Sequence, residues 1–247
     1  MKNDPYIVAA FLKAKKLDNW DAKGTSPIVT ISRQMGAMGE TIAYRTGNIL
    51  SEMSHDKHPW VVVDKDLGER VIKEHHLPKR MSSFFSGEHT VSMEEHFEGI
   101  VGISVPSTTM IEEMKQTVVR LARIGQVILV GRAAHLITAN FPRAMHVRII
   151  GSFDRRVERI AKIRQCSLNQ AAKEVRTMDR QRHHFTSTYF HSNLDDAEHY
   201  DMILNTDHIP VEECARVIAQ VVSSPDFRKR EARKLRDLRR RVLSKRL

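Results

Sequence analysis

The chain has 247 residues, a length that one α/β domain can fill and that allows a sizeable buried core. Its formal net charge of +10 would suggest a nucleic-acid partner, but the segment 226–247 holds eleven Lys/Arg against three acidic residues, so the preceding body is nearly neutral. Cys166 and Cys214 lie far apart without any CxxC or Cys/His spacing, which excludes a disulfide framework and a structural zinc site and indicates a reducing, cytoplasmic compartment.

Five short apolar runs rich in β-branched residues predict buried strands, at 27–32, 60–64, 127–131, 146–150 and 202–205. None of them alternates between apolar and polar residues, and helical stretches separate them. This pattern is typical of a parallel sheet covered on both faces. We therefore expect an α/β fold with a doubly wound five-stranded parallel sheet, as a single domain over residues 1–225.

A glycine-containing segment follows the first predicted strand directly and leads into a helical stretch. Its sequence is Arg33-Gln34-Met35-Gly36-Ala37-Met38-Gly39-Glu40-Thr41. A turn placed between a strand and a helix N-terminus can bind a phosphate through backbone N–H groups. No lysine follows the second glycine, so the GxxxxGK[ST] pattern is not met. Taken alone, the segment is either a phosphate loop or a tight strand-to-helix turn.

Charged residues that could serve phosphate chemistry lie in three further places. Asp64 ends the second predicted strand, where it could orient a hydroxyl, reach magnesium through water or cap a helix. Arg132 follows the third strand, in the crevice where parallel strands end, although a surface ion pair is the alternative. Arg176 and Arg180 share a helical face, either as part of a closing lid or as a solvated face with Asp179 as an ordinary partner.

Four segments carry a resemblance to a known family. The segment ISRQMGAMGETIA resembles the ISR-x-x-G-S-G-G-x-x-IA signature of the cytidylate kinase-like family, whose phosphate loop lacks the lysine. The segments VILVGRAAHLI, MHVRIIGSFDRRVERI and YDMILNTDHIPVEECARVI resemble the family's later elements in the same order, so the resemblance spans roughly 27–222. It implies a P-loop NTPase-type fold and transfer of the γ-phosphoryl group of ATP, with Mg²⁺, to a nucleoside monophosphate or related small acceptor.

The resemblance also implies roles for individual residues. The ATP-binding residues would be Arg33, Gly36, Ala37, Met38, Gly39, Glu40 and Thr41. Within this set, Arg33 would substitute for the missing lysine or hold the shape of the loop, and Thr41 is the nearest hydroxyl for a metal contact. Arg132 would bind the phosphate of the acceptor and Asp64 would lie near the acceptor. The stretch with Arg176 and Arg180 is similar to the arginine-bearing lid of nucleoside-monophosphate kinases, which here covers about 170–190.

Three departures from the family pattern favour a second hypothesis. Met38 and Ala133 stand where the family has glycines, and Glu40 stands where an arginine is common. A larger side chain narrows a phosphate loop and a carboxylate opposes phosphate, although negative charge also suits a helix start. The alternative function is therefore a catalytically degenerate nucleotide-binding sensor or scaffold, which would bind nucleotide without transferring phosphate.

Two regions complete the sequence-based expectations. The segment 81–106 has weak periodicity and several small residues, which suits a substrate-binding insert or lid. The basic segment 226–247 has a partial apolar stripe and is expected to be a docked or solvated helix, or a tail that is disordered in isolation, with nucleic acid or an anionic membrane as less favoured partners. The thirteen histidines form no metal pattern, so we expect no metal site built by the protein alone, and no run of about 18 apolar residues predicts a transmembrane segment.

Overall fold

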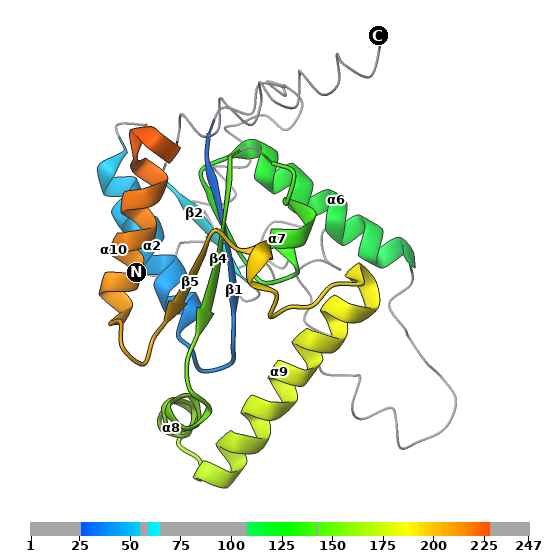
Figure 1. Ribbon diagram of the computed structural model, residues 1–247, viewed down its shortest axis with the longest axis vertical. Helices are drawn as coiled ribbons and strands as arrows, with labels where there is room; N and C mark the ends of the chain where they lie inside the picture. The colour runs from blue at the N-terminus through cyan, green and yellow to red at the C-terminus, as the bar shows by residue number, and fades with distance from the viewer. Residues whose placement is uncertain (1–25, 55–58, 65–107, 142, 228–247) are drawn as a thin grey trace, which may run out of the picture.

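The computed structural model describes residues 26–54, 59–64, 108–141 and 143–227; the expected insert at 81–106 and the basic segment beyond residue 227 lie outside them. A parallel sheet forms the centre of this part of the chain, with the strand order β2-β3-β1-β4-β5 (Figure 1). The strands are β1 (Ile28–Arg33), β2 (Val61–Val63), β3 (Val127–Val130), β4 (Ala144–Ile150) and β5 (Met202–Asn205). All four pairings are parallel, so the predicted five-stranded parallel sheet is confirmed.

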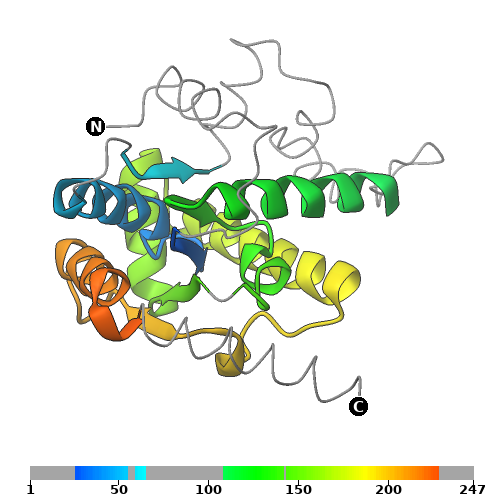
Figure 2. The ribbon, with the colours of Figure 1, turned by 90° about the horizontal axis from the view of Figure 1, so that it is seen from above.

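Helices cover both faces of the sheet, as a doubly wound fold requires. They are α2 (Gly39–Met53), α6 (Thr108–Ile124), α7 (Ala134–Ile137), α8 (Phe153–Arg164), α9 (Leu168–Phe190) and α10 (Val211–Ser223), with a short 3₁₀ helix at Ala197–His199. Helices α2 and α10 lie side by side on one face, and α6 lies on the other (Figure 2). Helix α8 and the start of α9 lie beyond the end toward which the strand arrows point (Figure 1). None of the helices described here is long and apolar enough to cross a membrane.

The period of two along each strand divides the core into two clusters. Val61 and Val63 pack with residues of α6 on one face, whereas Val62 between them packs with residues of α2 and α10 on the other. Every side chain of the central strand β1 from Ile28 to Ser32 is buried, because both of its edges and both of its faces are covered. The continuous apolar runs in the sequence reflect this double burial.

Helices α8 and α9 form a hairpin with a small core of its own. Val157, Ile160, Ala171 and Val175 pack together there. The Ser167 side chain accepts from the N–H of Gln170, whose own side chain accepts from the N–H of Ser167, which completes a capping box at the start of α9. The stretch expected to be a lid, at about 170–190, falls within the single long helix α9. From α8, this helix extends across the ends of the strands.

Candidate functional site

The glycine loop between β1 and α2 depends on the absence of side chains at two positions. Gly36 has a φ of +78°, and a Cβ added there would lie 2.6 Å from the carbonyl oxygen of Arg156. A Cβ at Gly39 would lie 2.6 Å from the Cβ of Arg33. Any side chain at either position would collide with its neighbour, so the loop is closely packed as well as tightly turned.

Met38 occupies the residue before α2 in the left-handed conformation, with a φ of +63°. This conformation costs an L-residue other than glycine roughly 1–2 kcal/mol, which explains why glycine suits this position better. The methionine therefore preserves the turn at a cost in backbone strain. The N–H of Ala37 donates to the Gln34 carbonyl oxygen at 3.2 Å, closing the turn from within.

Two arginines of α8 hold the loop from outside. The buried Arg156 donates from Nε to the Gly151 carbonyl oxygen at 3.0 Å and from Nη1 to the Met35 carbonyl oxygen at 2.9 Å. Arg159 donates to the Thr206 carbonyl oxygen at 2.7 Å and makes a longer contact of 3.4 Å with the Gly36 carbonyl oxygen. These two cations thus satisfy the carbonyl oxygens of Met35 and Gly36 in the loop.

A second unusual turn follows β3. Gly131, Arg132 and Ala133 have φ values of +80°, +57° and +50°, so three consecutive residues are left-handed. The N–H of Ala134 donates to the Gly131 carbonyl oxygen at 3.1 Å. Strain of this kind is concentrated at functional sites, where the surrounding structure maintains it. Ala133 replaces the glycine of the family pattern and, like Met38, adopts the conformation that glycine would favour.

Arg33 connects the two turns. A Cβ at Gly131 would lie 2.3 Å from the Arg33 Nη1, so only a glycine lets this guanidinium lie against the second turn. On its other side, Arg33 Nη2 donates to Glu40 Oε1 at 2.8 Å. The arginine side chain is 15 % exposed, whereas that of Glu40 is 54 % exposed. The Arg33 side chain is thus fixed between the glycine loop and the end of β3.

A pocket of about 110 Å³ opens between the end of β1, the turn after β3 and α9. Its walls are formed by Ser32, Arg33, Val130, Gly131, Arg132, Ala133, His135, Met178, Gln181, Arg182, Phe185, Thr186 and Leu194. Three of these residues are arginines and none is acidic, so the pocket suits an anion. The Met178, Phe185 and Leu194 side chains add an apolar wall.

Arg182 shows how strongly positive charge is concentrated there. Its Nη1 donates to the Arg33 carbonyl oxygen at 3.2 Å and lies 3.5 Å from Asp179 Oδ1. Burial and repulsion from Arg33 lower the pKa of the Arg182 guanidinium to about 9, although it stays charged at neutral pH. An anion in the pocket would relieve this repulsion.

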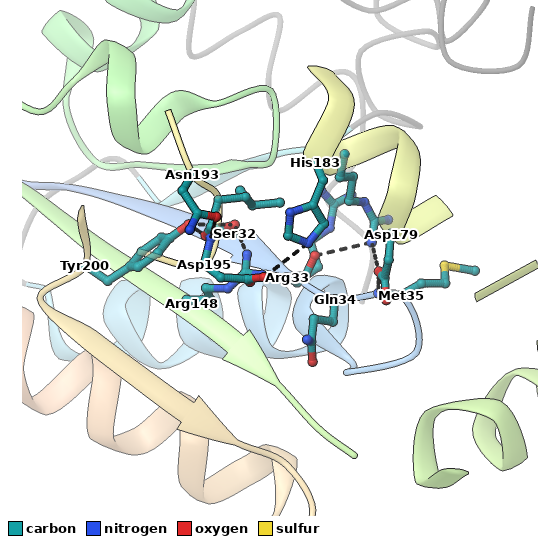
Figure 3. A network of polar contacts seen from close by, with 12 residues as sticks. Ser32, Arg33, Gln34, Met35, Arg148, Asp179, His183, Asn193, Asp195 and Tyr200 are labelled. Atoms are coloured by element: carbon teal, nitrogen blue, oxygen red, sulfur yellow. Dashed lines mark hydrogen bonds and ion pairs between the residues drawn. The ribbon is translucent and has the colours of Figure 1, made fainter. Parts of the chain in front are cut away.

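A polar network around the buried Arg148 and Ser32 lies next to the pocket (Figure 3). Arg148 donates to the Ser32 hydroxyl at 2.9 Å and pairs with Asp195. The Tyr200 hydroxyl donates to the Leu194 carbonyl oxygen at 2.8 Å and lies 3.2 Å from His135 Nε2. Burial, assisted by nearby His146, His199 and Arg148, lowers the pKa of His135 to about 3, so this ring is neutral at physiological pH.

The residues expected from the sequence are distributed unequally around this pocket. Arg33 and Arg132 line it, whereas the predicted loop residues from Gly36 to Thr41 are not among its walls. Thr41 lies in the first turn of α2 and is exposed. The buried Asp64 directly follows β2, at the same end of the sheet, and accepts from the Tyr44 hydroxyl at 2.6 Å.

The two arginines expected in a lid lie outside the pocket walls. Arg176 stacks over the Phe153 ring, with 4.6 Å between its Cζ and the ring centroid. Arg180 lines a separate depression with the histidines His183, His184 and His191. Arg182, from the same stretch, is the cation that α9 places in the pocket. Asp179 pairs with Arg156 and Arg182 rather than being an ordinary partner of Arg176 and Arg180.

Sequence reasoning also gave no role to Arg156 and Arg159. Their segment was similar to an arginine-rich helix of the family, but each arginine contacts a loop more than a hundred residues earlier. A signal was present, because two arginines one turn apart after a buried strand are positioned to face that loop.

A family model described as the cytidylate kinase-like family matches residues 28–208. The chain belongs to the cytidylate kinase-like family. Among solved structures, an uncharacterized protein from Eubacterium ventriosum ATCC 27560 is similar, with 17 % identity and a TM-score of 0.57, covering 81 % of this chain and 99 % of that one. At this identity the likeness concerns the fold alone. No curated protein matches the chain.

Membership of the cytidylate kinase-like family supports a nucleotide kinase-like function and, with it, nucleotide binding. The matched residues include both left-handed turns, both α8 arginines and the whole of α9. Within the described ranges, no group of three or more His, Cys, Asp or Glu side chains is arranged to hold a metal ion.

Proposed function

We propose that this protein transfers the γ-phosphoryl group of ATP to a nucleoside monophosphate or a related small phosphorylated acceptor. The observation that carries the proposal is the position of Arg33, which lies between a glycine loop at a helix N-terminus and a pocket lined by two more arginines. A donor phosphate at the loop and an acceptor phosphate in the pocket would then be neighbours, one on each side of Arg33. Phosphoryl transfer depends mainly on this kind of positioning and on positive charge.

Different residues would bind the phosphate donor and the phosphate acceptor. The loop from Gly36 to Gly39 and the start of α2 would bind the donor phosphates through backbone N–H groups. Arg132 and Arg182 would bind the phosphate of the acceptor in the pocket, and Met178 and Phe185 would contact its apolar or planar part. In the reaction, an acceptor phosphate oxygen forms a bond to the γ-phosphorus while the bond to the β–γ bridging oxygen breaks, and ADP leaves with the electron pair.

The protein groups near the proposed donor site fit a magnesium ion that is bound mainly by the phosphates of the nucleotide. The ion usually keeps several waters and binds through phosphates and one or two protein oxygens. The exposed Thr41 hydroxyl, in the first turn of α2, is the protein group suited to hold it, and bound Mg²⁺ would neutralise charge on the transferred group. Asp64 would orient the acceptor from the end of β2.

The test is an assay of ADP formation with ATP, Mg²⁺ and a panel of nucleoside monophosphates led by cytidine monophosphate. Acceptor-dependent ADP and a phosphorylated acceptor are the expected products. Arg132→Ala should lower kcat/KM by about 100-fold or more, since such donors supply several kcal/mol in the transition state. Arg120→Ala, an exposed arginine on α6, is the matched control and should be unchanged.

One observation favours the sensor hypothesis as the second candidate. Glu40 neutralises Arg33 at 2.8 Å, which weakens the cation that would replace the lysine. Binding of ATP without turnover of any acceptor would reject the kinase and support a nucleotide sensor.

A further inference from the structure

Asp179 of α9 places its carboxylate at the mouth of the glycine loop. Its Oδ1 accepts a hydrogen bond from the backbone N–H of Met35 at 2.8 Å. Its Oδ2 accepts from Arg156 Nη1 at 2.6 Å, and Arg182 Nη1 lies 3.5 Å from Oδ1. Figure 3 shows Asp179 pointing from α9 toward Met35, across 144 residues of sequence.

The donors around this carboxylate are of the kinds that bind phosphate. One is a backbone N–H of the residue before Gly36, and the other two are guanidinium groups from α8 and α9. Charge-assisted hydrogen bonds from arginines and loop N–H groups serve carboxylate and phosphate oxygens alike. The Asp179 side chain therefore occupies a position where an oxygen of a bound phosphate would find the same partners.

Helix α9 is held by apolar as well as polar contacts. Phe185 and Phe190 pack against the core of the sheet, and Met35 packs against the small core of the α8–α9 hairpin. Asp179 and Arg182 add polar contacts to the loop, at Met35 and at Arg33 respectively. These polar contacts exchange readily for others of equal strength, whereas the apolar contacts can hold α9 in place during the exchange. A ligand with more negative charge than one carboxylate can compete for the three donors.

We propose that Asp179 is an intramolecular competitor for the glycine loop, and that a bound polyphosphate displaces its carboxylate from Met35 and Arg156. The inference rests on the proposed function, because it requires the loop to be a phosphate site. Without nucleotide, the Asp179 carboxylate then occupies the phosphate site of the loop. The apparent affinity for nucleotide equals the intrinsic affinity multiplied by the fraction of molecules in which the carboxylate is undocked. Nucleotide binding and release of the Asp179 carboxylate become one coupled event.

The experiment measures the affinity of the full chain for tripolyphosphate and for MgATP by calorimetry, in wild type, Asp179→Asn and Asp179→Ser. The matched control is Glu174→Gln, because Glu174 also lies on α9 and pairs with α8 through Arg164 at 3.4 Å, away from the loop. A carboxylate docked nine-tenths of the time or more predicts at least about tenfold tighter tripolyphosphate binding in both Asp179 variants. Glu174→Gln should bind like wild type.

The possible outcomes separate this inference from the proposed function. If wild type binds tripolyphosphate and the Asp179 variants bind it equally or more weakly, the competitor role is overturned while the phosphate loop stands. If no variant binds either probe, the loop is not a phosphate site and both proposals fall. Loss of cooperative unfolding in both Asp179 variants would also overturn the inference, because a carboxylate that nucleotide displaces cannot be required for the fold.

Discussion

Replacing Arg156 by methionine tests how strongly α8 holds the glycine loop. The substitution keeps an unbranched chain that can fill the space, but it removes donors to the Gly151 and Met35 carbonyl oxygens and the ion pair with Asp179. Arg156 is 6 % exposed, so water replaces these contacts only in part. Truncating one partner of a buried charged pair costs about 3–5 kcal/mol, and we expect the free energy of unfolding to fall by that amount.

Urea denaturation followed by circular dichroism gives this free energy directly. The control is Arg155→Met, because Arg155 is an exposed neighbour on the same helix and should change stability by less than about 0.5 kcal/mol. A loss of under about 1 kcal/mol in the Arg156 variant would refute the reasoning, because the loop would then keep its shape without the guanidinium.

Three further predictions concern the loop and the pocket. Gly36→Ala should destabilise the protein by about 2–4 kcal/mol, from a left-handed alanine and its clash with the Arg156 carbonyl, and thermal unfolding that is unchanged would contradict this. Glu40→Gln should cost less than about 1 kcal/mol of stability, since the carboxylate is exposed, yet tighten tripolyphosphate binding several-fold by releasing Arg33; weaker binding would oppose this view. His135 binds a proton near pH 6.5 when unfolded but only near pH 3 when folded, so stability falls as the pH drops below 6.5. Between pH 7 and pH 5, wild type should lose about 2 kcal/mol more than His135→Gln in denaturant titrations, and equal losses would place the folded pKa close to 6.5.

The fold was predictable because its signals are local. Each strand is a short apolar run, and in β1 and β3 burial on both faces leaves no place for alternation. The edge strand β5 departs from the expected burial, because Ile203 is 41 % exposed. The glycine loop was recognisable because its two glycines lie within a few residues of each other, between a strand and a helix. The capping box at Ser167 likewise depends only on residues three apart.

The pocket was less predictable because long-range contacts decide which arginines face it. Arg176 and Arg180 share one helical face, and Asp179 and Arg182 share another, so spacing alone defines two equivalent choices. The second pair is selected by contacts of α9 with the glycine loop and the end of β1, which cross 144 residues to Met35 and 149 residues to Arg33. No local sequence pattern indicates which of the two pairs faces the loop and the pocket.

The order of the strands has a consequence for how the chain is made. Ile28 of β1 pairs with Val127 and Ala144, so the first strand of the described chain waits about a hundred residues for both of its neighbours. Helix α2, which follows β1, is covered by α10 near the end of the described chain, where Arg45 and Glu212 pair at 2.9 Å. Non-local pairing of this kind slows folding and exposes apolar strands during synthesis. The nascent chain therefore passes through a long interval in which β1 is uncovered, and chaperone binding to the segment around β1 during translation is the expected result.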